Sequence, residues 1–395
     1  MKTYNRLQKE ELPVKHHGIF RRHMSFWQAV TFITSGTIGA GVLGIPYAVA
    51  KVGIPLGLLY IVVIGLLMIG LNLMVGEIAV RTKSKLQLVG FAKKYLGGVG
   101  EVLMTVLVYI MLFGVLMVYI IGEGETLSAL LGGSAIVWST LFFICGSLLI
   151  YIGLRTIKTV EFILSIGILV VVMLVAAFSA PHIQMGHIGY TNLINVFVPY
   201  GVLLFAFHGT TAIPETYALV KEKRNVFKKA IIVGGIINII IYALFAVVVV
   251  GVTGMSSTEI ATIGLGEAIG PVMFVLGNIF AILAMGTSFI MAGLALRDSM
   301  QWDFKIGHTT ATALVCIVPF IFFLAGLRGF ITAIDIVGGV FMSLEMLLVI
   351  LIYYQAKKQG DVGKKSLHLK FTTPIAVLLV VALTIGAAYS VWQIF

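Results

Sequence analysis

The sequence contains few charged residues and few cysteines. Only 11% of its 395 residues are charged, whereas soluble domains contain about 25%. The two cysteines, Cys145 and Cys316, lie inside apolar stretches, where a small buried side chain is a more common role than a disulfide or a metal ligand. A glycine-lysine phosphate loop and a histidine-cysteine cluster are also missing. These absences argue against a soluble domain, an ATP-driven pump and a metalloenzyme.

Long apolar stretches dominate the sequence instead. Hydrophobic residues make up 59% of the chain and the mean hydropathy is +1.08. A helix that crosses a bilayer needs about 20 mostly apolar residues. The sequence therefore predicts an all-α integral membrane protein in a lipid bilayer, with about eleven spans near Phe26–Val52, Ile54–Val80, Gly97–Leu131, Ala135–Gly153, Val160–Ala180, Val196–Val220, Ala230–Val252, Val272–Leu296, Thr309–Leu327, Phe330–Tyr354 and Phe371–Phe395.

Basic residues are distributed unequally over the predicted loops. Residues 1–24 are polar and basic and contain no cleavable signal sequence, so we expect the amino terminus in the cytoplasm. Lysines and arginines then gather in the cytoplasmic loops, and only Lys51 and Arg328 fall outside. The net charge of +11 therefore indicates topology in a cytoplasmic membrane and not a nucleic-acid partner. An odd number of spans places the carboxyl terminus outside.

Two spans contain glycine, hydroxyl residues and proline at mid-membrane depth. They are the first, at Ser35–Pro46, and the sixth, at Phe205–Glu215. Paired broken helices of this kind indicate a transporter binding site, although glycines can also serve only close helix packing. Each break opens a set of five spans, so the second set must be inverted. We expect repeats at 25–180 and 195–354, followed by a loop and an eleventh helix at 355–395.

These breaks also carry a family resemblance. The stretch from Thr37 to Tyr47, TIGAGVLGIPY, resembles the first-helix signature of the amino acid/auxin permease family, within the amino acid–polyamine–organocation superfamily. The sixth span and the basic loop after it are similar to the same family. The resemblance implies a LeuT-type fold, a five-plus-five inverted repeat with helices 1 and 6 broken and one extra helix. It also implies a secondary transporter of small neutral or aromatic amino acids, coupled to sodium or protons, and not an enzyme.

An amino acid in the membrane needs partners for its carboxylate and its ammonium. The half-helix beginning near Val42 offers N–H groups and a positive dipole to the carboxylate, and carbonyls of the second break face the ammonium. His208 either joins this site as an acceptor or protonatable group, or is a histidine hydrogen-bonded within the bundle. The predicted substrate-binding residues are Thr37, Gly39, Ala40, Gly41, Phe205, Ala206, Phe207, His208 and, closing the site from the side, Tyr109.

The coupling ion has two interpretations. Ala284, Thr287 and Ser288 share one helix face, and the resemblance adds the carbonyls of Ser35 and Ile38 to form a sodium site, since hard cations prefer oxygen ligands. Alternatively, the two hydroxyls bond back to their own helix. In the proton-coupled interpretation Lys158 replaces the sodium ion, unless it is an interfacial lysine whose amine reaches the cytoplasm. No other cofactor is expected.

Two functions are compatible with such a site. The first is a cation-coupled symporter for neutral amino acids that works by alternating access. The second is a membrane nutrient receptor, or sensor subunit, that binds an amino acid without net transport. Neither break contains an acidic residue at its centre, which argues against cationic substrates. Glu345 is the deepest of the other acidic residues in the spans, and we expect it to face the bundle interior.

Overall fold

The computed structural model describes residues 25–84, 86–152, 170–220, 224–362 and 372–394, together with single residues 167, 367 and 369. Seven helical segments in this part of the chain are long and apolar enough to cross a membrane. They are Ile54–Arg81, Leu88–Leu131, Ala135–Ile152, Arg224–Ser256, Pro271–Gln301, Phe330–Gln359 and Thr373–Trp392.

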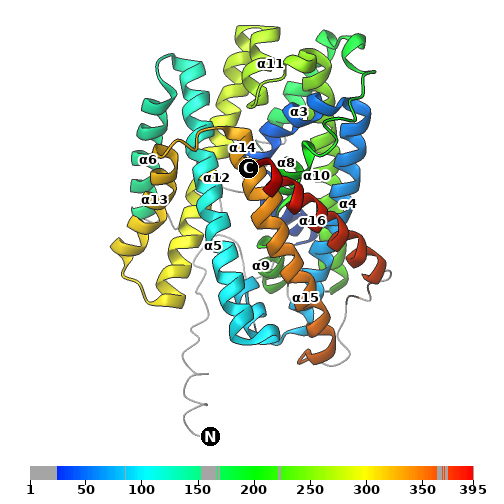
Figure 1. Ribbon diagram of the computed structural model, residues 1–395, viewed down its shortest axis with the longest axis vertical. Helices are drawn as coiled ribbons and strands as arrows, with labels where there is room; N and C mark the ends of the chain where they lie inside the picture. Colours follow the sequence, from blue (N-terminus) through cyan, green and yellow to red (C-terminus); the bar gives the residue numbers. More distant parts are fainter. Residues whose placement is uncertain are drawn as a thin grey trace, which may run out of the picture.

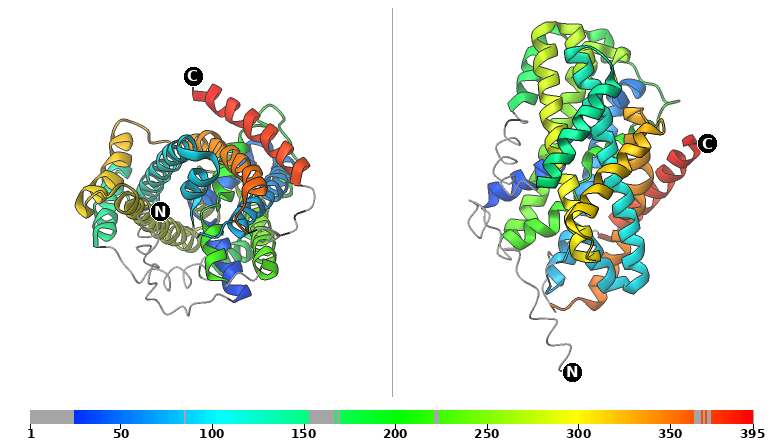
Figure 2. Two further views of the ribbon diagram at one scale, coloured as in Figure 1. Left: turned by 90° about the horizontal axis from the view of Figure 1, so that it is seen from below. Right: turned by 90° about the vertical axis from the view of Figure 1, so that its left-hand side faces the viewer.

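The helices run largely along the long axis of the molecule, with α6 and α13 at one side and α4 and α16 at the other (Figures 1 and 2). Their bounds are α2 Phe26–Ser35, α3 Gly41–Val52, α4 Ile54–Arg81, α5 Leu88–Leu131, α6 Ala135–Ile152, α8 Pro199–Phe207, α9 Ala212–Leu219, α10 Arg224–Thr253, α11 Ala261–Ile269, α12 Pro271–Phe304, α13 His308–Leu324, α14 Phe330–Ile336, α15 Ser343–Gln359 and α16 Thr372–Ile394. Short 3-10 turns lie at Ala180–His182, Met185–His187 and Gly254–Ser256, and a π turn, η4, spans Val337–Met342.

Both predicted breaks are present. The first span divides into α2, which begins behind a capping box at Ser25, and α3, which begins at Gly41. The sixth divides into α8, which ends at Phe207, and α9, which begins at Ala212. Because lipid cannot satisfy the backbone groups freed by such breaks, they must face protein or an internal cavity. The broken first and sixth spans predicted from glycine and proline are confirmed.

The structure refines several predicted boundaries. α5 begins at Leu88, but Gly97 interrupts it with φ +75°, so the helical segment after this kink begins at the predicted start of the third span. α12 continues beyond Leu296 to Phe304, and the tenth span contains the unpredicted π turn η4. Of the fifth predicted span, Val160–Ala180, the structure describes residue 167 and residues 170–180, and a shorter apolar helix runs over Val170–His182.

The helices around the breaks determine which side chains reach them. α10 packs against α2, α3 and α4, and α8 packs against α3, α4 and η4. On the other side of the bundle α5 lies along α12, α6 and α15. The two breaks are therefore enclosed by α5, α10, α12 and α15, and those helices supply the side chains considered next.

Candidate functional site

The two breaks lie directly against each other. A Cβ placed on Gly41 would lie 2.5 Å from Ala206 Cα, so the start of α3 touches the backbone of α8. A Cβ on Gly209 would lie 2.5 Å from the Thr37 hydroxyl oxygen. Real Cβ atoms do not approach other atoms this closely, so both positions require glycine. Gly41 thus serves close packing of the two breaks, and a side chain there would displace α8.

A tyrosine that sequence reasoning missed joins the two breaks. The Tyr242 hydroxyl on α10 donates to the carbonyl of Ala206 at 2.8 Å and to that of Thr37 at 3.2 Å. The side chain is fully buried, and its ring packs edge-on against Phe207 with centroids 4.8 Å apart. Because one hydroxyl proton is shared between two carbonyls, the contact holds both breaks at one fixed spacing.

The first break also meets α5 and α12. A Cβ on Gly39 would lie 3.0 Å from the hydroxyl oxygen of Tyr119 and 3.7 Å from that of Ser288. Tyr119 is buried on α5, and Ser288 is half-buried on α12. α3 begins beside them without a side-chain cap, and the N–H groups of Val42 and Leu43 donate to the carbonyls of Gly39 and Ala40 at 3.3 and 3.0 Å. The two hydroxyl groups and the positive end of the α3 dipole together form a site suited to a carboxylate.

The second break carries a buried polar cluster. His208 Nε2 lies 2.6 Å from Glu345 Oε2, and the Thr210 hydroxyl donates to Glu345 Oε1 at 3.1 Å. Thr210 Oγ1 also lies 3.1 Å from His208 Nε2. Glu345 and Thr210 are fully buried. Glu345 therefore faces the bundle, and α15 brings a carboxylate to a break whose own sequence has none at its centre.

Two of the carbonyls predicted to receive the substrate ammonium already have donors. The Phe205 carbonyl accepts the His208 N–H at 3.3 Å, and the Ala206 carbonyl accepts the Tyr242 hydroxyl. A carbonyl oxygen has two lone pairs, so each retains one acceptor position.

The predicted sodium ligands are brought together only in part. Ser288 reaches the first break at Gly39, next to Ile38. The Thr287 hydroxyl donates to the carbonyls of Leu283 at 2.8 Å and Ala284 at 3.3 Å, and the Ser35 hydroxyl donates to Phe32 at 3.2 Å. The Thr287 bonds follow the alternative in which a hydroxyl bonds back to its own helix. The sequence predicts that Ser35 binds through its carbonyl, and the bond of its hydroxyl does not test that prediction.

Two other predicted positions do not join this arrangement. The Tyr109 hydroxyl lies 2.7 Å from the Ser299 hydroxyl. Ser299 is eleven residues, or about 16 Å of helix, beyond Ser288, so Tyr119 reaches the break and Tyr109 does not. Lys158 lies outside the described residues.

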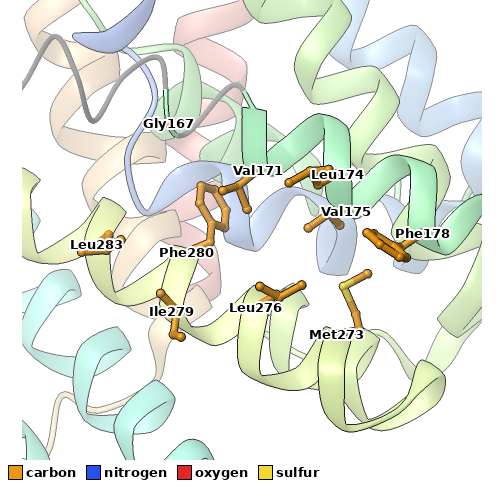
Figure 3. Close-up of a pocket in the computed structure, with 10 residues that line it drawn as sticks. All are labelled: Gly167, Val171, Leu174, Val175, Phe178, Met273, Leu276, Ile279, Phe280 and Leu283. Atoms are coloured by element: carbon orange, nitrogen blue, oxygen red, sulfur yellow. The ribbon is translucent and has the colours of Figure 1, made fainter.

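An apolar cavity lies apart from the breaks, between α12 and the segment 170–178. Figure 3 shows side chains from both segments facing one another across it. Its lining carries no hydrogen-bonding side chain to receive a carboxylate or an ammonium and consists of Gly167, Val171, Leu174, Val175, Phe178, Met273, Leu276, Ile279, Phe280 and Leu283.

Sequence comparison decides the family. Residues 22–391 match the tryptophan/tyrosine permease family. The chain belongs to that family. It is therefore a membrane permease homologue rather than an enzyme homologue. The amino acid/auxin permease family indicated by the first-helix motif is related, but it is not the family found.

Individual relatives of this permease are bacterial amino acid transporters. The chain is 25% identical over 355 residues to "Tyrosine-specific transport system 1" of Haemophilus influenzae, and this match covers 83% of this chain and 88% of the relative. It is 26% identical over 336 residues to "Tyrosine-specific transport system 2" of the same organism, covering 78% and 82%. It is 23% identical over 359 residues to "Glutamine transporter 2" of Aliivibrio fischeri, covering 85% and 91%.

A solved structure confirms the fold class. The crystal structure of MhsT in complex with L-phenylalanine superimposes with a TM-score of 0.69 at 13% identity, over 94% of this chain and 100% of that one. MhsT has the LeuT-type fold. The permease therefore has the five-plus-five arrangement with broken helices 1 and 6 that the sequence predicted.

Proposed function

We propose that this permease is a cation-coupled symporter that carries neutral amino acids by alternating access, with tyrosine and similar aromatic amino acids as its first candidate substrates. The observation that carries this proposal is the meeting of the two breaks, joined by the Tyr242 hydroxyl. Two relatives named for tyrosine transport support an aromatic substrate.

The substrate carboxylate is assigned to the first break. The positive end of the α3 dipole and the hydroxyl of Tyr119 beside Gly39 favour a carboxylate there. The ammonium is assigned to the carboxyl end of α8, where the remaining lone pairs of Phe205 and Ala206 and the negative end of the helix dipole favour a cation. Each charged group of the substrate would then meet one broken helix, so that substrate binding depends on both repeats.

The coupling ion is a separate step of the proposal. The Thr287 hydroxyl donates its proton to carbonyls of its own helix and keeps its oxygen lone pairs, so these bonds do not prevent it from binding a cation. We propose a proton as the coupling ion because α5 buries the carboxyl group of Glu123 inside the bundle. The amino-terminus-inside topology in a cytoplasmic membrane and the two repeats at 25–180 and 195–354 remain predictions.

Equilibrium binding tests the substrate assignment. Labelled tyrosine should bind the purified protein and be displaced by phenylalanine and tryptophan but not by lysine. Glutamine is the informative competitor, since one relative is named for it. Displacement by lysine as effective as that by phenylalanine would contradict a neutral aromatic site.

A further inference from the structure

α5 buries a carboxyl group that has no side chain beside it to neutralise it. Glu123 is 0% exposed, and among the described residues neither of its carboxylate oxygens has a hydrogen-bond partner. A Cβ built on Gly286 of α12 would lie 3.1 Å from Glu123 Oε1, so the carboxyl group lies against the backbone of that helix. An unpaired charge at membrane depth is strongly unfavourable, and ionisable residues kept there usually have a functional role.

Glycines on both sides of Glu123 bring three helices together around it. A Cβ on Gly122 would lie 2.5 Å from Met285 on α12, and a Cβ on Gly124 would fall onto the Ser139 hydroxyl of α6. Small residues at such positions allow helices to approach closely in a membrane. The Glu123 carboxyl therefore lies in a narrow seam between α5, α6 and α12.

The titratable groups near this seam are few. α6 contributes Phe142 and α12 contributes Gly286, neither of which titrates. On α5 itself Tyr119 lies one turn earlier, and Glu125 lies two residues later and interacts with Glu259. The buried side chains of His208 and Glu345 bond to each other at the second break.

One turn of α5 connects the seam around Glu123 to the proposed substrate site. Tyr119 and Glu123 are four residues apart, so they lie on the same face of α5, and the Tyr119 hydroxyl reaches Gly39 in the first break. On α12, Ser288 faces the same glycine two residues after Gly286. A rearrangement of the first break would therefore act on the face of α5 that carries Glu123 and on the turn of α12 that contains Gly286.

The chemistry of the seam suits a proton and not a metal cation. Hard cations require about six oxygen ligands, whereas the two oxygens of Glu123 are accompanied by a glycine and a phenylalanine. A proton requires only one oxygen. Protonation also removes the unfavourable buried charge, so the closed seam holds the neutral acid.

We propose that Glu123 is the proton-binding residue that couples proton movement to amino acid transport, an inference that rests on the symport function proposed above. When the seam is open to the outer water, a carboxylate oxygen takes one proton and an O–H bond forms. When the seam opens inward, that bond breaks and the proton enters the cytoplasmic water. One proton crosses per cycle, and no other reactant is consumed.

Glu123→Gln tests this inference because glutamine has nearly the shape of the protonated acid and cannot titrate. Parent and variant are reconstituted in liposomes. One assay measures the accumulation of labelled tyrosine under an imposed pH gradient of about one unit, and the other measures the exchange of labelled tyrosine against unlabelled tyrosine inside the liposomes. At one proton per substrate such a gradient sustains up to about tenfold accumulation. The matched control is Glu101→Gln, on the same helix but at the surface in an ion pair with Lys93.

We expect Glu123→Gln to retain exchange and to lose accumulation, falling from about tenfold to about onefold, while Glu101→Gln accumulates like the parent. Proton-driven accumulation by Glu123→Gln equal to that of the parent would overturn the inference. If a sodium gradient alone drives the parent, symport stands and the proton site does not. If the parent neither exchanges nor accumulates tyrosine, the proposed function itself fails.

A second measurement holds even if Glu123→Gln does not fold. Infrared difference spectra of the parent with and without tyrosine should show a change in a carboxylic-acid C=O band, and Glu123→Asp should shift that band. A spectrum of the parent without any substrate-dependent carboxylic-acid band would overturn the inference.

Discussion

Removal of the Tyr242 hydroxyl should weaken substrate binding without disturbing the surrounding core. Tyr242→Phe keeps the ring and its contact with Phe207 but leaves the carbonyls of Thr37 and Ala206 without their shared donor. A buried acceptor that loses its partner costs about 1–3 kcal/mol, which corresponds to about 5-fold to 150-fold in an equilibrium constant. We therefore expect the affinity for tyrosine to fall within that range.

Two quantities are measured on the purified protein. The first is the equilibrium binding of labelled tyrosine, and the second is the midpoint temperature at which heating removes half of the monodisperse protein. Tyr151→Phe is the control, because that tyrosine is 45% exposed on α6 and lies far from both breaks in the sequence. Tyr242→Phe should lower both the affinity and the midpoint, and the control should change neither. An affinity within about twofold of the parent, with an unchanged midpoint, would refute the proposed linkage of the breaks.

Three further substitutions test separate parts of the site. Gly41→Ala should abolish tyrosine binding, because the new Cβ collides with the backbone of α8. Gly98→Ala is the control and should bind tyrosine normally, because a Cβ there has no atom within 4 Å. Equal binding by the two variants would show that the close approach of α3 to α8 is unnecessary. Tyr119→Phe should raise the Kd for tyrosine about tenfold through loss of a hydrogen bond to a charged group, and an unchanged Kd would remove it from the carboxylate site. His208→Gln should alter the pH profile of uptake between about pH 5 and 8; an identical profile would assign His208 a packing role.

Much of the fold is predictable from the sequence because its signals are local. Long apolar runs predict the spans, and glycine with proline at mid-membrane depth predicts both breaks. Local signals also explain the errors. Lys93 and Lys94 interrupt the apolar pattern before Gly97, so composition does not show that residues 88–96 form a helical segment ahead of the kink at Gly97. The π turn after Ile336 has no marker in composition.

The site was less predictable because its contacts join distant parts of the chain. Tyr242 is 205 residues from Thr37, and Glu345 is 137 residues from His208. Polar residues in otherwise apolar spans are the signals that point to them, but only tertiary packing shows which of these residues meet. Tyr109 and Tyr119 illustrate the difficulty, since both are tyrosines of α5 and only the helix register decides which one reaches the first break.

The central claim is that this chain alone moves an amino acid across a membrane, using two broken helices as its binding site. The most direct test is accumulation of labelled tyrosine by liposomes that contain only the purified protein, with an imposed inward proton gradient. We predict accumulation above the external concentration that collapses when a protonophore dissipates the gradient and that Gly41→Ala abolishes. Saturable tyrosine binding to the same preparation without net uptake under either a proton or a sodium gradient would contradict the claim and indicate a receptor.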